Sequence, residues 1–128
     1  MNTSADSFAE QCAVLRAAYA AFNARDIPAA LALMTADVAW PRAFKGGCVH
    51  GHDGVRAYWT AQWHEIDPHV APLAFQPEPA GRILAEVRQV VRDLGGNVLA
   101  DGIVGHRFTL DGCLIRDMEV QPLPPAAG

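Results

Sequence analysis

Two stretches in the C-terminal half alternate apolar and polar residues as β-strands do, and each carries one polar residue on its apolar face. The inward sets would be Ile83, Ala85, Val87, Gln89 and Val91 in one stretch, and Val98, Ala100, Gly102, Val104, His106, Phe108 and Leu110 in the other. Because strand side chains alternate between two faces, Gln89 and His106 are predicted to point toward the core. Burying an amide or an imidazole without a partner is unfavourable, so each must be hydrogen-bonded or face a wet cavity. The sequence therefore predicts a lined pocket within a sheet.

The preceding part of the chain has helical patterns. Apolar residues recur every three or four positions over 7–25, with Ser7 as the expected N-cap and Glu10 completing a capping box. A second, short helix is expected from Asp26, with Pro28 in its first turn. A third is expected over 52–66. The remaining segments read as strands, over 37–44, 70–76, 82–93, 98–110 and 113–121.

This order of elements predicts an α+β fold in which one face of a mainly antiparallel sheet covers three N-terminal helices. With 128 residues the chain is long enough for one domain with a substantial core, expected over 7–121. The Pro/Ala-rich segment 122–128 is expected to be a disordered tail.

Charge and composition exclude several classes of partner. The net charge is −4 and the ten Lys and Arg residues are scattered, which argues against nucleic acid. No apolar run reaches the length of a membrane span, and the N-terminus lacks the pattern of a secretory signal, so no membrane partner is expected. Cys12, Cys48 and Cys113 are odd in number and widely spaced, which indicates a reducing, cytoplasmic setting. No phosphate-binding glycine loop occurs, so no cofactor is expected.

Several local strings, in their order and spacing, resemble the nuclear transport factor 2-like superfamily, specifically its SnoaL-like and ketosteroid-isomerase-like branch. These strings are Tyr19-Ala-Ala-Phe-Asn-Ala-Arg-Asp-Ile27, Leu33-Met-Thr-Ala-Asp-Val-Ala-Trp40, Gly51-His-Asp-Gly-Val-Arg-Ala-Tyr-Trp59 and Asp111-Gly-Cys-Leu-Ile115. The resemblance covers nearly the whole of 8–121. It implies a cone-shaped α+β barrel of the cystatin-like type, closed by helices around an apolar cavity, and a homodimer packed sheet to sheet. This scaffold hosts isomerases, cyclases, dehydratases, hydrolases and binders, so it does not identify the chemistry.

The catalytic positions of ketosteroid isomerase are not matched. That enzyme, a worked example in general accounts of pKa tuning, uses a carboxylate base and a Tyr–Asp oxyanion site. An ungapped match places these three positions on Arg42, Ala18 and Val104, with Tyr19 one residue away. We therefore expect a different mechanism.

The cyclase branch has a Gly-x-Ile-x-x-His-Trp-Asp pattern in its last strand, and the corresponding string is Gly112-Cys-Leu-Ile-Arg-Asp-Met-Glu119. Glu119 occupies the place of the acid/base carboxylate, while Asp117 and Met118 replace the His and Trp. If Leu114, Met118 and Val120 form the buried face, Glu119 points outward unless a bulge turns it inward.

His106 is the main candidate for catalysis, as a general acid or base or as a hydrogen-bond donor to a ligand carbonyl. The alternative is a core histidine bonded to Gln89 or to a backbone carbonyl. Gln89 could orient a ligand or only serve His106, and Gln62 could join the same polar set or lie at the helix border. The remaining pocket candidates are aromatic and would suit a planar or ring-containing ligand, or else form plain core: Tyr19, Trp40, Trp59, Trp63 and Phe108.

Cys48, His50 and His52 are three metal-capable residues at alternate positions. No obvious fourth ligand exists, and loop residues before a helix explain the pattern equally well, so no metal site is predicted.

The sequence thus predicts a cofactor-free protein that holds a small apolar or aromatic molecule, and the resemblance implies a homodimer. If it is an enzyme, proton transfer is the simplest chemistry, and the resemblance implies the isomerisation, cyclisation or dehydration of a carbonyl compound. A binding or interaction module without turnover is the alternative, since the inferred inward faces carry no carboxylate. A third hypothesis is a dimerisation scaffold whose cavity is filled by its own side chains.

Overall fold

The structure, a computed structural model, describes residues 4–42 and 46–121, with side chains of the first helix from Phe8 onward. The predicted tail 122–128 lies outside the described residues. The helices are α1 (Ser4–Asn23), α2 (Ile27–Leu31) and α3 (Gly51–Trp63). The strands are β1 (Met34–Pro41), β2 (Cys48–His50), β3 (Ile66–Glu78), β4 (Arg82–Asp93), β5 (Val98–Asp111) and β6 (Leu114–Gln121), with a short 3₁₀ turn over Pro79–Gly81.

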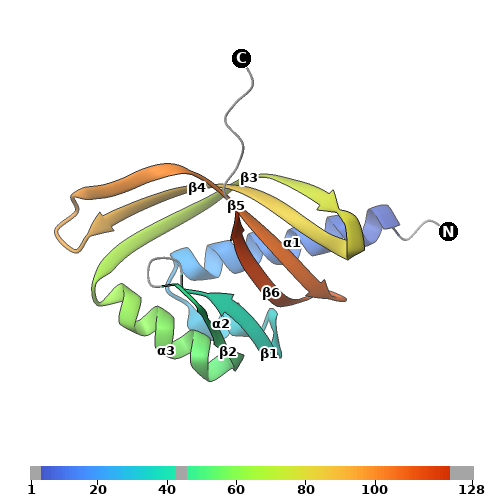
Figure 1. Cartoon of the computed structure of the whole chain (residues 1–128), viewed down its shortest axis with the longest axis horizontal. Coiled ribbons are helices and arrows are strands. Elements are labelled where there is room, and N and C mark those ends of the chain that lie inside the picture. The colour runs from blue at the N-terminus through green and yellow to red at the C-terminus, as the bar shows by residue number, and fades with distance from the viewer. Residues whose placement is uncertain (1–3, 43–45, 122–128) are drawn as a thin grey trace, which may run out of the picture.

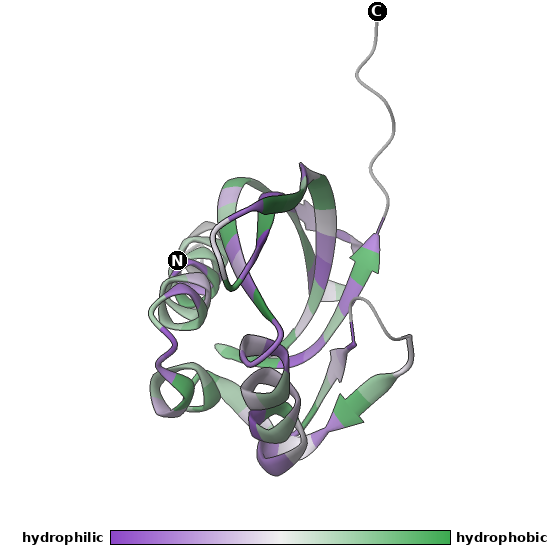
Figure 2. Cartoon of the chain, turned by 90° about the vertical axis from the view of Figure 1, so that its left-hand side faces the viewer, coloured by the Kyte–Doolittle hydropathy of each residue, from purple (hydrophilic) through white to green (hydrophobic). Residues whose placement is uncertain are grey.

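The strands form one curved, six-stranded sheet in the order β2-β1-β6-β5-β4-β3 (Figure 1). All neighbouring pairs are antiparallel except β1 and β6, which run parallel. The helices lie on one side of the sheet, and hydropathy alternates along the strands, as expected for strands with one face covered (Figure 2). The α+β class and the cone-like arrangement of sheet and helices agree with the prediction.

The core lies between the helices and the inner face of the sheet. Its fully buried side chains come from every layer: Leu15 from α1, Val38 from β1, Val55 and Trp59 from α3, Ile83 and Val87 from β4, Phe108 from β5 and Ile115 from β6. The predicted inward set of β4 is correct for Ile83, Ala85, Val87 and Val91, which are buried.

Burial of the predicted inward set of β5 is wrong for Val98, Ala100 and Gly102, which are exposed, although Ala100 and Gly102 pair with Val91 and Gln89 of the inner face. The loop end of the β4–β5 hairpin extends past the helices (Figure 1), and Ala100 is exposed on β5 although its β4 partner Val91 is still buried. Residues from Val104 onward lie over the helices and follow the predicted alternation: His106 and Phe108 are buried.

Several element boundaries differ from the prediction. Helix α1 begins at Ser4, so Ser7 lies inside the helix and is not its N-cap. Asp26 does cap α2, since its Oδ1 accepts a hydrogen bond from the Ala29 N–H at 3.2 Å. Helix α3 ends at Trp63, and Ile66 already belongs to β3. The predicted end of the first strand, Phe44, lies outside the described residues.

Strand β3 extends beyond the predicted 70–76 at both ends, so Pro68 and Pro77, which lie just outside that prediction, belong to it together with Pro72. Proline cannot donate to a sheet ladder and is confined to edge strands, and β3 is the edge strand beside β4. The prolines therefore do not interrupt the strand.

The outer side of this edge is closed by the end of α1. The Asn23 Nδ2 donates to the Val70 carbonyl at 2.7 Å, and the Val70 N–H donates to the Asn23 Oδ1 at 3.0 Å. One side chain thus satisfies both backbone groups of an edge residue and fixes the helix against the strand.

Replacing Asn23 by Ala is expected to lower the free energy of unfolding by about 1–3 kcal/mol, because two part-buried hydrogen bonds are lost and both Val70 groups are left unpaired. Urea unfolding measures this loss. Gln11→Ala is the matched control: it removes one exposed hydrogen bond, from Nε2 to the Gly112 carbonyl, and should change the unfolding free energy by less than about 0.5 kcal/mol. Equal losses in the two variants would contradict the proposed role of Asn23.

Candidate functional site

A hollow lies between the inner face of the sheet and the helices. The room in which the centre of a water molecule can move is ≈ 70 Å³. One water needs about 10–15 Å³ by this measure, so the hollow is large enough for several waters. Its wall is made by Ala18, Tyr19, Phe22, Trp40, Pro41, Tyr58, Trp59, Gln62, Pro68, Val70, Gln89, His106, Phe108, Met118 and Val120. The protein's own side chains therefore do not fill the hollow, in contrast to the third hypothesis.

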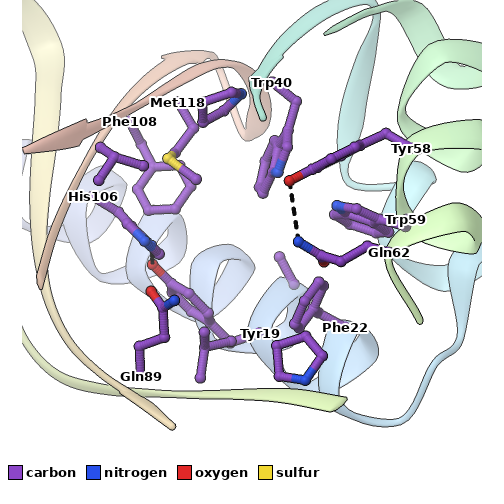
Figure 3. Close-up of a pocket in the computed structure, with 15 residues that line it drawn as sticks. Tyr19, Phe22, Trp40, Tyr58, Trp59, Gln62, Gln89, His106, Phe108 and Met118 are labelled. Carbon is purple, nitrogen blue, oxygen red and sulfur yellow. Dashed lines mark hydrogen bonds between the residues drawn. The ribbon is translucent and has the colours of Figure 1, made fainter. Parts of the chain in front are cut away.

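Most of the residues singled out in the sequence come together on this wall. They are Tyr19 from α1, Trp40 from β1, Trp59 and Gln62 from α3, Gln89 from β4, and His106 and Phe108 from β5 (Figure 3). The sheet curves around the hollow, so side chains more than 80 positions apart in sequence, such as Tyr19 and His106, come into contact.

Trp63 does not line the hollow. Its ring packs behind the wall, with centroids 5.4 Å from Phe22 and 5.8 Å from Trp59, and the Arg25 guanidinium lies over it at 4.8 Å. Trp63 follows Trp59 by one helical turn, and at the end of α3 that turn already lies against the end of α1. Trp63 was expected to line the pocket, but it supports the aromatic wall from behind.

Glu119 also lies outside the hollow. It is exposed and pairs across the sheet with Arg107, whose guanidinium forms an ion pair with Glu78 at 2.6 Å. A register shift between β5 and β6 occurs before Met118, and Met118 is buried. Glu119 therefore keeps its place on the opposite face from Met118, and the bulge does not turn it inward.

A second hollow opens beside the first. Its walls include the polar side chains of Arg42, Cys48, Asp117 and Glu119. Burial, and then the neighbouring charge of Glu119, raise the pKa of the Asp117 carboxyl. The two hollows share the wall residues Pro41, Met118 and Val120. The carboxylates are thus neighbours of the aromatic hollow and not part of its lining.

The most unusual feature of the first hollow is a buried hydrogen bond between a tyrosine and a histidine. The Tyr19 hydroxyl lies 2.7 Å from the His106 Nδ1, and the two rings are stacked, with centroids 5.9 Å apart and an interplanar angle of 14°. Only 7% of Tyr19 and 6% of His106 are exposed. His106 is therefore bonded to Tyr19, and among the residues that the structure describes its side chain bonds to neither Gln89 nor a backbone carbonyl.

Burial controls the protonation of both groups. It lowers the pKa of His106 to about 4 and raises the pKa of Tyr19 well above its usual value. In each case the charged form would have to be placed in an apolar surrounding. At neutral pH the pair consists of an uncharged imidazole and an uncharged phenol.

The shared hydrogen bond allows two arrangements of the protons. If the Tyr19 O–H donates to Nδ1, the imidazole carries its proton on Nε2 and can donate it to a ligand. If the Nδ1–H donates to the Tyr19 oxygen, Nε2 has a free lone pair and the phenol O–H can donate elsewhere. Among the residues that the structure describes, Nε2 has no partner, so the pair can act as donor or acceptor toward the hollow.

Two amides complete the polar part of the lining. Gln89 has no side-chain hydrogen bond to any described residue. On the opposite side of the hollow, the Gln62 Nε2 donates to the Tyr58 hydroxyl at 3.1 Å (Figure 3). The structure therefore offers a ligand polar groups on two sides.

Between these polar groups the wall is aromatic. The Trp40 ring lies 5.5 Å from Trp59 and 6.4 Å from Phe108, and Phe108 lies 6.0 Å from Tyr19, measured between centroids. Phe22 closes the belt at 5.1 Å from Trp59. Edge-to-face and tilted packing of this kind holds each ring in place and leaves a flat-walled apolar space.

Sequence reasoning overlooked part of the wall. Phe22 belongs to the apolar stripe expected for the first helix, and Pro68 falls between the expected helix over 52–66 and the expected strand over 70–76, yet both line the hollow. Phe22 is one helical turn after Ala18 and Tyr19, so its spacing could have placed it beside them. Pro68 gave no such signal, since its position depends on the extension of the edge strand.

Cys48, His50 and His52 do not converge. The Cys48 Sγ lies 3.8 Å from the His50 Nε2 on the exposed strand β2, whereas the His52 Nε2 lies 3.1 Å from the Met34 carbonyl. Among the described residues, no group of three or more His, Cys, Asp or Glu side chains is placed to hold a metal ion.

Residues 15–116 match the family of the SnoaL-like domain, which is most of the chain. The chain belongs to this SnoaL-like family. No curated protein matches the sequence. Solved structures place the SnoaL-like domain in the nuclear transport factor 2-like superfamily and show the same fold with modest sequence identity.

Three of these structures are informative. TerC, co-crystallised with polyporic acid, is 25% identical, with a TM-score of 0.76 over 87% of this chain and 89% of that one. A nuclear transport factor 2-like protein of unknown function from Burkholderia pseudomallei K96243 is 27% identical, with a TM-score of 0.75 over 88% and 89%. A putative polyketide cyclase from Pseudomonas putida KT2440 is 25% identical, with a TM-score of 0.69 over 84% and 86%.

None of the helices within the described ranges of this SnoaL-like domain has the length and apolar character that crossing a bilayer requires.

The lowered pKa of His106 predicts a specific loss of stability in acid. Between about pH 6.5 and pH 4 the unfolded chain binds a proton at this residue that the folded SnoaL-like domain does not bind, so the free energy of unfolding falls as the pH falls through this window. Above about pH 6.5 the group has no such effect. At about pH 5 its share of the loss is about 2 kcal/mol.

Urea unfolding at about pH 7 and pH 5 measures this loss, with His106→Gln beside the wild type. The variant should lose less stability over this interval than the wild type, whereas His69→Gln, at an exposed position of β3, should behave as the wild type does. Identical losses in all three proteins would contradict the burial of a neutral His106.

Proposed function

We propose that the protein binds a small, ring-containing, mostly apolar molecule in the hollow and catalyses a cofactor-free proton transfer on a carbonyl group of that molecule. Isomerisation, cyclisation and dehydration are the reactions of this type. The observation that carries the proposal is the Tyr19–His106 hydrogen bond, buried in an otherwise aromatic cavity.

The pair has the chemical groups that such a reaction needs. In the arrangement with the proton on Nδ1, the His106 Nε2 accepts a proton from the carbon next to the ligand carbonyl. The Tyr19 O–H, held by the Nδ1–H, donates to the carbonyl oxygen as negative charge develops there. Return of the proton from Nε2 to a different atom of the ligand completes the transfer.

The low pKa of His106 is compatible with this role. It results from burial, which disfavours the imidazolium, so the imidazole is unprotonated and ready to accept a proton at neutral pH. A developing enolate beside the ring would offset part of that penalty, because an opposite charge at close range favours the protonated form. The aromatic wall excludes water and strengthens this interaction.

The relatives support a small-molecule occupant. TerC was crystallised with polyporic acid, and the protein from Pseudomonas putida is described as a putative polyketide cyclase. Glu119 is not included in the proposed mechanism, because its side chain lies outside the hollow. The free thiols of Cys48 and Cys113 are exposed, which is consistent with a reducing, cytoplasmic setting.

A binding module without turnover is the second candidate. The described residues that line the hollow include no Asp and no Glu, so the titratable groups that they bring to the wall are one histidine and two tyrosines. A protein that only holds its ligand needs hydrogen bonds and apolar contact, both of which the wall provides.

Deuterium exchange separates the two candidates. β-Tetralone, a bicyclic ketone, is incubated with the protein in heavy water, and exchange of the protons next to the carbonyl is followed by NMR. His106→Gln is expected to slow the protein-dependent exchange about 100-fold, since general acid–base catalysis contributes about 10²–10⁴-fold. Tyr19→Phe should slow it less, because the imidazole remains.

His69→Gln is the control and should exchange at the wild-type rate. Unchanged exchange in His106→Gln would refute the role of this residue. Binding of the ketone, detected by calorimetry, without any protein-dependent exchange would favour the binding module.

We further propose that a second copy of the chain covers the outer face of the sheet. Leu99 and Ile103 point to that face from the uncovered half of β5 and are 59% and 49% exposed, and Leu94, at the hairpin turn, is 63% exposed. Exposed apolar side chains gathered on one element are typical of a protein interface.

Light scattering tests this dimer. The wild type should have twice the mass of one chain, and Ile103→Arg should shift it to the monomer, because a charge would be buried at the interface. Ala57→Asp, at an exposed position on α3 away from the sheet face, should leave the mass unchanged. A monomeric wild type would contradict the proposal.

A further inference from the structure

We infer that the ligand of the hollow carries two oxygen functions at opposite ends of a planar ring, and that Gln62 is the residue that recognises the second one. This inference rests on the proposed function and adds to it a substrate class and a specificity-determining residue.

The polar side chains of the hollow lie in two groups on opposite sides (Figure 3). Tyr19, His106 and Gln89 form one group, on α1 and the sheet (Figure 3). Tyr58 and Gln62 form a second group, on one face of α3, at the other side of the hollow. Each group contains a ring hydroxyl and an amide, so each can donate and accept hydrogen bonds.

Aromatic rings lie between the two groups. They are the rings of Trp40, Trp59, Phe22 and Phe108, and their faces offer an occupant apolar contact. An occupant complementary to this wall is flat and apolar in the middle and polar at both ends. A ring with one oxygen would satisfy one polar group and leave the other facing apolar surface.

The Gln62 amide is held in place by one hydrogen bond and has further hydrogen-bonding groups to offer. Its Nε2 donates one hydrogen bond to the Tyr58 hydroxyl, which fixes the plane of the amide. The second N–H and the carbonyl have no partner among the residues that the structure describes. Amide groups on the wall of an apolar cavity are unfavourable unless water or a ligand satisfies them, so an oxygen of the ligand is the natural partner of this pre-oriented group.

The inference is tested with three probes that share one ring system: naphthalene, β-naphthol and naphthalene-2,6-diol, whose hydroxyls lie at opposite ends. Their affinities for the wild type, Gln62→Leu, Tyr19→Phe and Gln76→Leu are measured by calorimetry. Gln76 is exposed on β3 and does not line the hollow, so Gln76→Leu is the matched control for loss of a glutamine. Circular dichroism establishes that each variant is folded.

The wild type should bind the diol about two- to tenfold more tightly than β-naphthol, since one additional hydrogen bond contributes a modest net free energy. Gln62→Leu should remove that preference and leave the affinity for β-naphthol nearly unchanged. Tyr19→Phe should reduce the affinity for both hydroxylated probes. Gln76→Leu should reproduce the wild type.

Equal affinity of the wild type for the diol and β-naphthol would overturn the inference, as would a preference for the diol that persists in Gln62→Leu. Either result leaves the proposed function intact, because the ring still binds. Failure of all three probes to bind would contradict the proposed function, and the inference with it.

Discussion

The hydrogen bond between the Tyr19 hydroxyl and the His106 imidazole joins the first helix to the middle of the sheet, and the arrangement of the hollow depends on it. It satisfies two polar groups that are almost completely buried. Without it, each would be an unpaired polar group in an apolar wall, an arrangement that folded proteins avoid. The same bond holds both rings at the edge of the hollow, where they face any occupant. Both the placement of the two rings on the wall and the proposed proton transfer therefore depend on this hydrogen bond.

The fold could be predicted from the sequence because its signals are periodic. The alternation in 82–93 gave the strand and its inner face, and the helical spacing of apolar residues gave α1. Asp26 and Pro28 marked the start of α2 by their capping chemistry. The errors arose where tertiary structure overrides local pattern. Pro68 and Pro77 suggested the limits of β3, but an edge strand tolerates proline and continues through both.

The candidate site was only partly predictable. Strand alternation placed Gln89 and His106 on the inner face, and the structure finds both on the wall of the hollow. The partner of His106 could not be predicted, because the contact with Tyr19 joins elements far apart in the chain. The place of Trp63 depended on where α3 ends, and the place of Glu119 depended on a register shift between β5 and β6. Local sequence patterns specify neither. Alternation also cannot show where the helices stop covering a strand, and for this reason Val98 and Ala100 are exposed where the pattern predicted burial.

The Asn23–Val70 contact limits substitution at position 23 much more than at position 70. Asn23 is four residues after Tyr19, so both side chains lie on the same side of α1, and the contact determines how the helix is rotated about its axis. On the strand it uses only backbone atoms, so the side chain at position 70 can vary while the contact persists. On the helix it needs a short side chain with both a donor and an acceptor, a combination that few amino acids provide. Substitution at position 23 would therefore remove one restraint on the rotation of the helix that carries Tyr19, whereas substitution at position 70 would change only the shape of the wall.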